Sequence, residues 1–102
     1  MELIGKKVII RANRAGVFFG TLKEKRETSA GVEVVLENSR RLWYWDGAAS
    51  LSQLATEGTK KPSSCKFCVT VPEHNVMQVI EIIPCSDKAI KSIKAVKVWR
   101  IS

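Results

Sequence analysis

The sequence contains only one histidine and three cysteines in 102 residues. The histidine, His74, lies between Glu73 and Asn75 in a segment that we expect to be a hairpin loop, and we predict an exposed turn position for it. A lone histidine can act as a general base. However, the sequence contains no G-x-S-x-G motif, H-x-x-E pattern or carboxylate pair to act with it. We therefore predict a binding protein rather than an enzyme.

The few cysteines also argue against a metal centre. Cys65 and Cys68 have the C-x-x-C spacing of half a zinc site, but Cys85 is alone and the second half is missing. The redox version of this motif opens a helix after a strand, whereas this pair lies in an apparent strand. We predict no metal and no cofactor, and we expect at least one of the pair to be a small buried hydrophobic residue.

Long hydrophobic runs are absent too. No stretch of about 18 apolar residues occurs, so we predict no membrane-spanning helix. The segment Met1–Lys7 lacks the basic-then-apolar order of a signal peptide, and a sparse, odd set of cysteines is typical of a reducing compartment. We expect a single domain over residues 1–102, located in the cytoplasm.

Acidic residues are outnumbered, since 17 Lys and Arg face 10 Asp and Glu for a net charge of +7. Such an excess attracts anions without specifying which. The basic residues of the tail and of Lys23–Arg26 are interleaved with other residues, which is typical of a solvated face. RNP-like strands, G-x-x-G loops and helix-turn-helix patterns are missing, so we predict no nucleic-acid polymer as partner. A small basic module that binds nucleic acid or protein is the alternative.

The most informative segment is Arg40–Ala49, with the sequence RRLWYWDGAA. Arginine grips phosphate through two-point contacts, and Trp and Tyr offer flat faces to a base. Phosphate-cradling glycine motifs are absent, so phosphate binding would depend on Arg40, Arg41 and the backbone N–H groups of Gly47–Ala49. The combination suits a small phosphorylated ligand with a base. The alternative is that the tryptophans fill a small core and the arginines lie at its rim.

Strand alternation leaves the orientation of these side chains open. Arg40 and Tyr44 would share one face, and Arg41, Trp43 and Trp45 would share the other. The same rule predicts that one ring of the Phe18–Phe19 pair enters the core and the other points outward.

The periodicity and turn residues predict an α+β fold, a small antiparallel curled sheet or open barrel with two short helices. One helix would follow Ser50 or Asp46 as N-cap and end at Gly58, and a second would cover residues 87–93 after Ser86. Glu37–Ser39 would form a tight hairpin and Pro72–Asn75 a loop. The expected strands are Leu3–Arg11, Val17–Leu22, Val32–Leu36, the Arg/Trp segment, Lys66–Val71, Val76–Ile83 and Val96–Ile101.

Three segments of the sequence resemble a known family of small phage proteins. These segments are Gly16–Leu22, Asn38–Leu51 and Glu81–Cys85, within which R-R-L-W-x-W-x-G-A is the distinctive motif. The resemblance is to the first-described Thoeris anti-defence (anti-Thoeris) family, and it covers essentially the whole chain.

The resemblance implies a sponge that binds a TIR-derived cyclic ADP-ribose isomer (gcADPR) without degrading it, so that the Thoeris effector is not activated. It also implies a homo-oligomer, a dimer or hexamer, in the cytoplasm of the infected bacterial host. Some members of the family bind cyclic oligonucleotides at a separate site. Together with residue chemistry, the motif gives these candidate ligand-binding residues: Phe18, Asn38, Arg40, Arg41, Trp43, Tyr44, Trp45, Asp46, Gly47 and Ala48.

Overall fold

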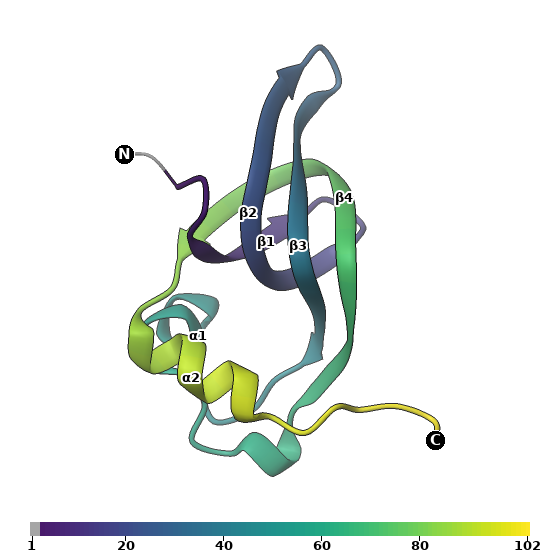
Figure 1. Cartoon of the computed structure of the whole chain (residues 1–102). Helices are drawn as coiled ribbons and strands as arrows, with labels where there is room; N and C mark the ends of the chain where they lie inside the picture. The colour runs from purple at the N-terminus through teal and green to yellow at the C-terminus, as the bar shows by residue number, and fades with distance from the viewer. Residues whose placement is uncertain (1–2) are drawn as a thin grey trace.

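The computed structural model, which describes residues 3–102, contains one antiparallel sheet of four strands that closes into a ring (Figure 1). The strands are β1 (Lys7–Ala12), β2 (Gly16–Thr28), β3 (Gly31–Tyr44) and β4 (Lys66–Pro84). β1 closes the ring because it pairs with both β2 and β4. The sheet is therefore a closed barrel rather than an open one.

Two short helices lie together at one end of the barrel (Figure 1), as the sequence predicts. They are α1 (Leu51–Glu57) and α2 (Asp87–Ala95), and a 3-10 turn, η1, covers Pro62–Ser64. The Oγ atom of Ser50 accepts a hydrogen bond from the Gln53 amide at 3.1 Å, so Ser50 is the N-cap of α1 and Asp46 is not. Ser86 caps α2 in the same way. Both caps fix where the helices begin.

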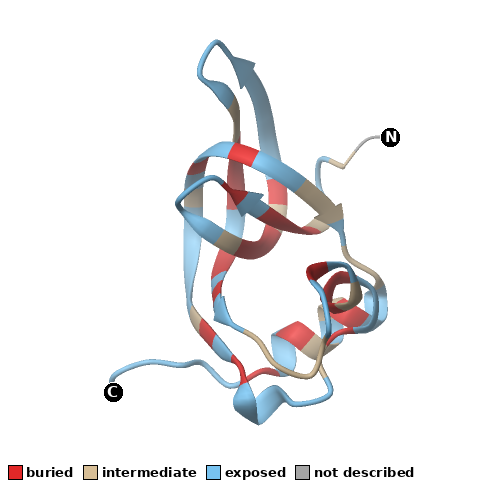
Figure 2. Cartoon of the chain, turned by 180° about the vertical axis from the view of Figure 1, so that it is seen from behind, coloured by how far each residue is buried: buried red, intermediate tan, exposed pale blue. Residues whose placement is uncertain are grey.

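β1 is buried on both of its faces. Val8, Ile9 and Ile10 are fully buried, and they alternate between two hydrophobic clusters. Ile9 packs in the cluster that includes residues of α1 and α2, whereas Val8 and Ile10 pack in a cluster of strand residues alone. Figure 2 shows buried positions along strands and helices alike. The helices thus cover a face of the sheet that would otherwise contact water.

The same two clusters explain the Phe18–Phe19 pair. Phe19 packs on the side of the helices and Phe18 packs among the strands, and both rings are buried. The prediction that one of these rings points outward is wrong. Alternation does send the two rings to opposite faces, but each face has a core.

The predicted hairpin at Glu37–Ser39 is also wrong, because β3 runs through it as one strand. Asn38 has a positive φ of 54° and forms a bulge, since Phe19 pairs with Arg40 while Thr21 pairs with Glu37. Gly20 faces this bulge, and a Cβ atom there would lie 3.0 Å from the Glu37 carbonyl oxygen. Asparagine tolerates the left-handed conformation, so a turn residue here bends a strand without ending it.

β4 is a single strand of 19 residues, whereas the sequence predicted two strands and a loop at Pro72–Asn75. Glu37 pairs with Glu73 and Ser39 with Val71, so Pro72 lies opposite the bulged Asn38. A proline lacks the backbone donor of a regular ladder and is tolerated at bulges. The irregular positions Asn38 and Pro72 therefore face each other, and β3 and β4 both continue past them.

The predicted ends of the chain differ as well. Residues 3–6 form a turn rather than the start of a strand. Val96–Ile101 is not a strand, because only Val98 forms an isolated bridge, to Phe67. Within residues 3–102, neither helix is long and apolar enough to cross a membrane.

Candidate functional site

A pocket of about 490 Å³ opens between the turns of the barrel and the middle of β4. This volume lies within the range of about 300–1,000 Å³ that is usual for small-molecule sites. The β1–β2 turn, the β2–β3 turn and three strands contribute to its wall. The lining residues are Asn13, Arg14, Ala15, Phe18, Thr28, Ala30, Gly31, Val32, Glu33, Arg41 and the segment 74–78.

Three side chains from three strands form a stack at one wall of this pocket. The Cζ atom of Arg41 lies 4.8 Å from the centroid of the Phe18 ring. His74 meets the same ring edge-on, with 5.0 Å between the ring centroids. Because Phe18 is only 1% exposed, a ligand would contact the guanidinium rather than the ring beneath it. The guanidinium is itself planar and can stack against a base.

His74 is a half-buried strand residue, so the predicted exposed turn position is wrong. Its Nδ1 atom lies 3.1 Å from the Oγ atom of Ser39. Burial lowers the pKa of His74, and the positive charge of Arg41 lowers it further. His74 is therefore neutral at neutral pH and serves the pocket as a hydrogen-bonding and packing group.

Two arginines give the pocket its positive charge. Arg41 lies in its wall and Arg14, with a positive φ of 72°, belongs to the β1–β2 turn. Glu33 also lines the pocket, but its carboxylate accepts bonds from Arg26 at 2.7 Å and 3.0 Å. In the described part of the chain, neither Arg14 nor Arg41 forms an ion pair with a carboxylate. Both guanidinium groups are therefore available to an anion.

Arg40, the other arginine of the motif, has a structural position. Its guanidinium is buried and donates to the carbonyl oxygens of Phe67, Cys68 and Ile93 at 3.0–3.1 Å. Burial also lowers its pKa. These bonds tie β3 to β4 and to the end of α2. The structure therefore places Arg40 in the core, away from the phosphate contact that the sequence predicted.

Trp45 to Ala48 also lie outside the pocket. Trp45 and Ala48 are half-buried against the cluster on the side of the helices. The Oδ1 atom of Asp46 accepts a hydrogen bond from the Gly47 amide at 2.7 Å. A Cβ atom on Gly47 would lie 2.4 Å from the backbone nitrogen of Lys61. The Gly47 backbone therefore packs against the protein rather than against a ligand.

The remaining predicted residues are exposed but do not line the pocket. Asn38 is in the bulge, and Trp43 and Tyr44 lie where β3 ends. Of the ten predicted residues, the structure brings only Phe18 and Arg41 together in the pocket. His74, Asn75 and Gln78 were missed as pocket residues. The signal that would have found them is strand register, which places His74 opposite Leu36 in β3.

The cysteines do not gather. Cys65 is buried, as expected for one of the pair, and burial raises the pKa of Cys85 to about 12. Among residues 3–102, no group of three or more His, Cys, Asp or Glu side chains could hold a metal ion.

These features define a class: a small closed β-barrel with two capping helices and a basic pocket between its turns. The chain belongs to the family described as a domain of unknown function (DUF6948), which matches residues 5–93. No curated protein and no solved structure gives a significant match.

Proposed function

We propose that the protein binds a TIR-derived cyclic ADP-ribose isomer and sequesters it without degrading it, so that the Thoeris effector of the infected bacterium is not activated. The observation that supports this pocket as the site is the Arg41 guanidinium, which lies over the Phe18 ring without a carboxylate partner among the described residues and is accompanied by Arg14. The proposal also includes a cytoplasmic location and a homo-oligomeric assembly, as the family resemblance implies.

The pocket offers a group for each part of such a ligand. A pyrophosphate can lie between Arg14 and Arg41, since guanidinium groups bind phosphate oxygens in pairs of hydrogen bonds. Adenine can stack on the outer face of the Arg41 guanidinium. The side-chain amides of Asn13, Asn75 and Gln78 can bond ribose hydroxyls and base edges. The volume of about 490 Å³ suits a compact cyclic dinucleotide-like molecule.

The contact between Ser39 and His74 supports binding over cleavage. A serine beside a histidine can be a nucleophile with its base. However, Ser39 is only 1% exposed, so its hydroxyl cannot reach a ligand in the pocket. The pair instead orients the imidazole at the wall.

The test is isothermal titration of the protein with a glycocyclic ADP-ribose, followed by heat release and chromatography of the ligand. We expect nanomolar binding and recovery of intact ligand. Arg41→Ala should weaken binding by about ten-fold to a hundred-fold, because a hydrogen bond to a charged group contributes about 1.5–3 kcal/mol. Arg11→Ala is the matched control, since Arg11 pairs with Glu81 and does not line the pocket. Absence of binding, or recovery of cleaved ligand, would overturn the proposal.

A further inference from the structure

Three exposed aromatic side chains lie outside the pocket, around the end of β3. Trp43 is 63% exposed, Tyr44 49% and Trp99 47%. Tyr44 and Trp99 come from distant parts of the sequence, and the fold places both next to Lys66. Tyr44 pairs with Lys66 across the β3–β4 ladder, and the Lys66 Nζ atom lies 5.4 Å from the Trp99 ring centroid. Trp99 is held there by its amide, which donates to the Phe67 carbonyl at 2.9 Å.

A local irregularity of β3 causes the exposure of Trp43 and Tyr44. Leu42 pairs with Phe67 but Tyr44 pairs with Lys66, so the register shifts at Trp43. Leu42 and Phe67 are buried, whereas Tyr44 and Lys66 are exposed. Because a bulge breaks alternation, two consecutive aromatic side chains both face solvent. Large rings in such a position are available to a partner.

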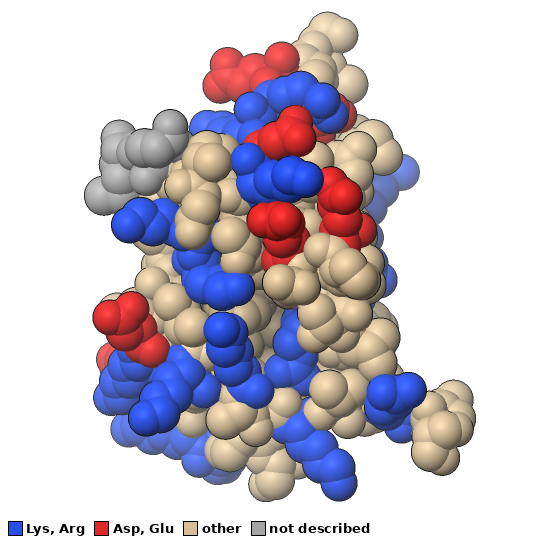
Figure 3. All heavy atoms as spheres, in the orientation of Figure 1, with Lys and Arg blue, Asp and Glu red and all other residues tan. Residues whose placement is uncertain are grey.

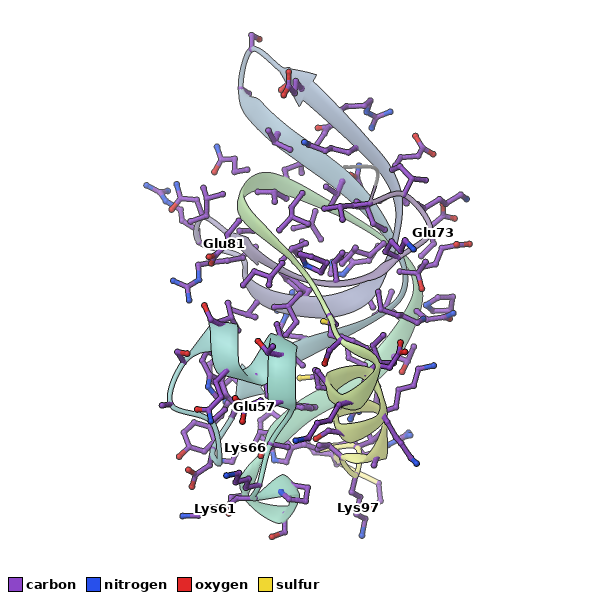
Figure 4. All side chains as sticks on the ribbon, turned by 90° about the vertical axis from the view of Figure 1, so that its left-hand side faces the viewer. Glu57, Lys61, Lys66, Glu73, Glu81 and Lys97 are labelled. Carbon is purple, nitrogen blue, oxygen red and sulfur yellow. The ribbon has the colours of Figure 1, made fainter. Side chains whose placement is uncertain are left out.

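Lysine side chains lie near these rings. Figure 4 shows Lys61, Lys66 and Lys97 at the same end of the molecule as Glu57, while Glu73 and Glu81 lie farther up the barrel. In Figure 3, Lys and Arg atoms gather over the lower part of the face, where Figure 1 places the helices. A smaller pocket of about 270 Å³ lies beside Trp99, and its walls include Pro62, Lys97 and Val98.

We propose that this surface binds single-stranded nucleic acid with little sequence preference, independently of the pocket between the barrel turns. Bases would stack on Trp99, Tyr44 and Trp43, and phosphates would contact Lys66, Lys97 and Lys61. Exposed rings alternating with cations are the means by which single strands are bound without base readout. An acidic peptide would pair with the lysines but would leave three rings without a role. Double-stranded nucleic acid would not fit this surface, because its bases stack on one another and their faces are not free to contact the rings.

The sequence argued against a nucleic-acid polymer as partner, because the aromatic residues are concentrated in the segment Arg40–Ala49. Trp99 and Lys66 join that segment only through the β3–β4 ladder and the Phe67 contacts. The folded surface is therefore longer and more basic than the motif alone.

The experiment is fluorescence anisotropy with labelled oligo(dT) and oligo(U) of about 12 nucleotides, a length that covers typical single-strand sites. We expect micromolar or tighter binding at about 50 mM salt, which weakens as salt rises to about 200 mM. Trp99→Ala and Tyr44→Ala should each weaken binding by about five-fold to a hundred-fold, the range expected for one stacked base. Lys66→Gln should weaken binding and flatten its salt dependence.

Ile101→Ala is the matched control for Trp99→Ala, since Ile101 is 96% exposed on the same terminal segment and should leave binding unchanged. Arg41→Ala should also bind oligonucleotide normally, which separates this surface from the pocket. Circular dichroism checks that each variant is folded. The proposal is overturned if neither oligonucleotide binds at low salt, or if the ring substitutions leave the affinity unchanged while Lys66→Gln alone reduces it.

Discussion

The guanidinium of Arg41 lies 4.8 Å from the centroid of the Phe18 ring, and this contact joins the pocket to the barrel core. Phe18 is packed among strand residues such as Ile10 and Leu36, so its ring is fixed. The Arg41 guanidinium thereby lies over a rigid aromatic ring. A binding group that is ordered before the ligand arrives loses less conformational entropy on binding.

The first prediction concerns this support. Phe18→Leu should keep the fold but lower the free energy of unfolding by about 1 kcal/mol, because it keeps most of the buried volume. Leucine has no aromatic face for Arg41, and a cation–π contact contributes about 0.5–2 kcal/mol. The affinity for a nucleotide ligand should therefore fall as well. Urea unfolding and isothermal titration measure the two effects.

Phe19→Leu provides the comparison, because Phe19 is equally buried but packs in the other cluster. It should lower stability by a similar amount and leave the affinity unchanged. If both variants lose affinity equally, the Phe18 ring has no specific effect on Arg41.

The second prediction separates the two adjacent arginines. Arg40→Ala should lower the free energy of unfolding by about 3 kcal/mol, because it removes three hydrogen bonds that a buried guanidinium donates to the carbonyls of Phe67, Cys68 and Ile93. Arg40→Lys should recover only part of this loss, since an ammonium cannot reproduce the planar fork. Arg41→Ala should change stability by less than about 1 kcal/mol. Thermal or urea unfolding of the three variants checks this order.

The third prediction is a pH dependence from His74. Its pKa is below the ordinary 6.5 in the folded state. The unfolded chain therefore binds more protons between the two pKa values, and the free energy of unfolding falls as the pH drops below about 6.5. The chain has no other histidine. His74→Gln should remove this fall in urea unfolding followed from about pH 8 to about pH 5.

An anionic ligand should oppose the contribution of Arg41 to this lowered pKa, because a negative charge beside Arg41 favours protonated His74. Binding should then tighten as the pH falls below about 6.5 and should take up protons. An affinity independent of pH in the wild-type protein would mean that the anion does not lie near His74.

The fourth prediction concerns Gly47, which the sequence placed near the ligand. Its φ is +80°, and a Cβ atom would lie 2.4 Å from the backbone nitrogen of Lys61 and 2.7 Å from that of Lys60. Gly47→Ala should lower stability by about 2–4 kcal/mol through backbone strain and this clash. Gly16→Ala is the control with positive φ and open space around it, so it should cost only about 1–2 kcal/mol.

The turns at residues 13–16 and 28–31 and the Ser86 cap of α2 could be predicted from the sequence, because their turn and capping residues act locally. The cap of α1 stayed open between Ser50 and Asp46, and the fold decides for Ser50. Asn38 and Pro72 misled for the same reason. Each residue favours a turn in isolation, but in the fold they lie opposite one another in continuous strands. Only the pairing of β3 with β4 decides between these outcomes, and pairing is a long-range interaction.

The site shows the same limit. The sequence named Phe18 and Arg41, which line the candidate pocket, because their residue types suit a ligand on their own. It could not place His74 next to Phe18, because they meet through different strands of the barrel. It also gave Arg40 and Arg41 equal standing, since adjacent arginines differ only once it is known which face of the strand meets the α2 carbonyl.

The ring closes through the pairing of Val8 with Pro84, residues at opposite ends of the sheet's sequence. A ribosome must therefore release nearly all of β4 before the barrel can be completed. The β2–β3 hairpin has local pairing and can form early, on the microsecond scale of hairpins. Closure depends on contacts of high sequence separation, which fold slowly. We expect the barrel to be completed only after β4 has left the ribosome, and the nascent β2–β3 hairpin to carry an open edge on β3 until β4 pairs with it.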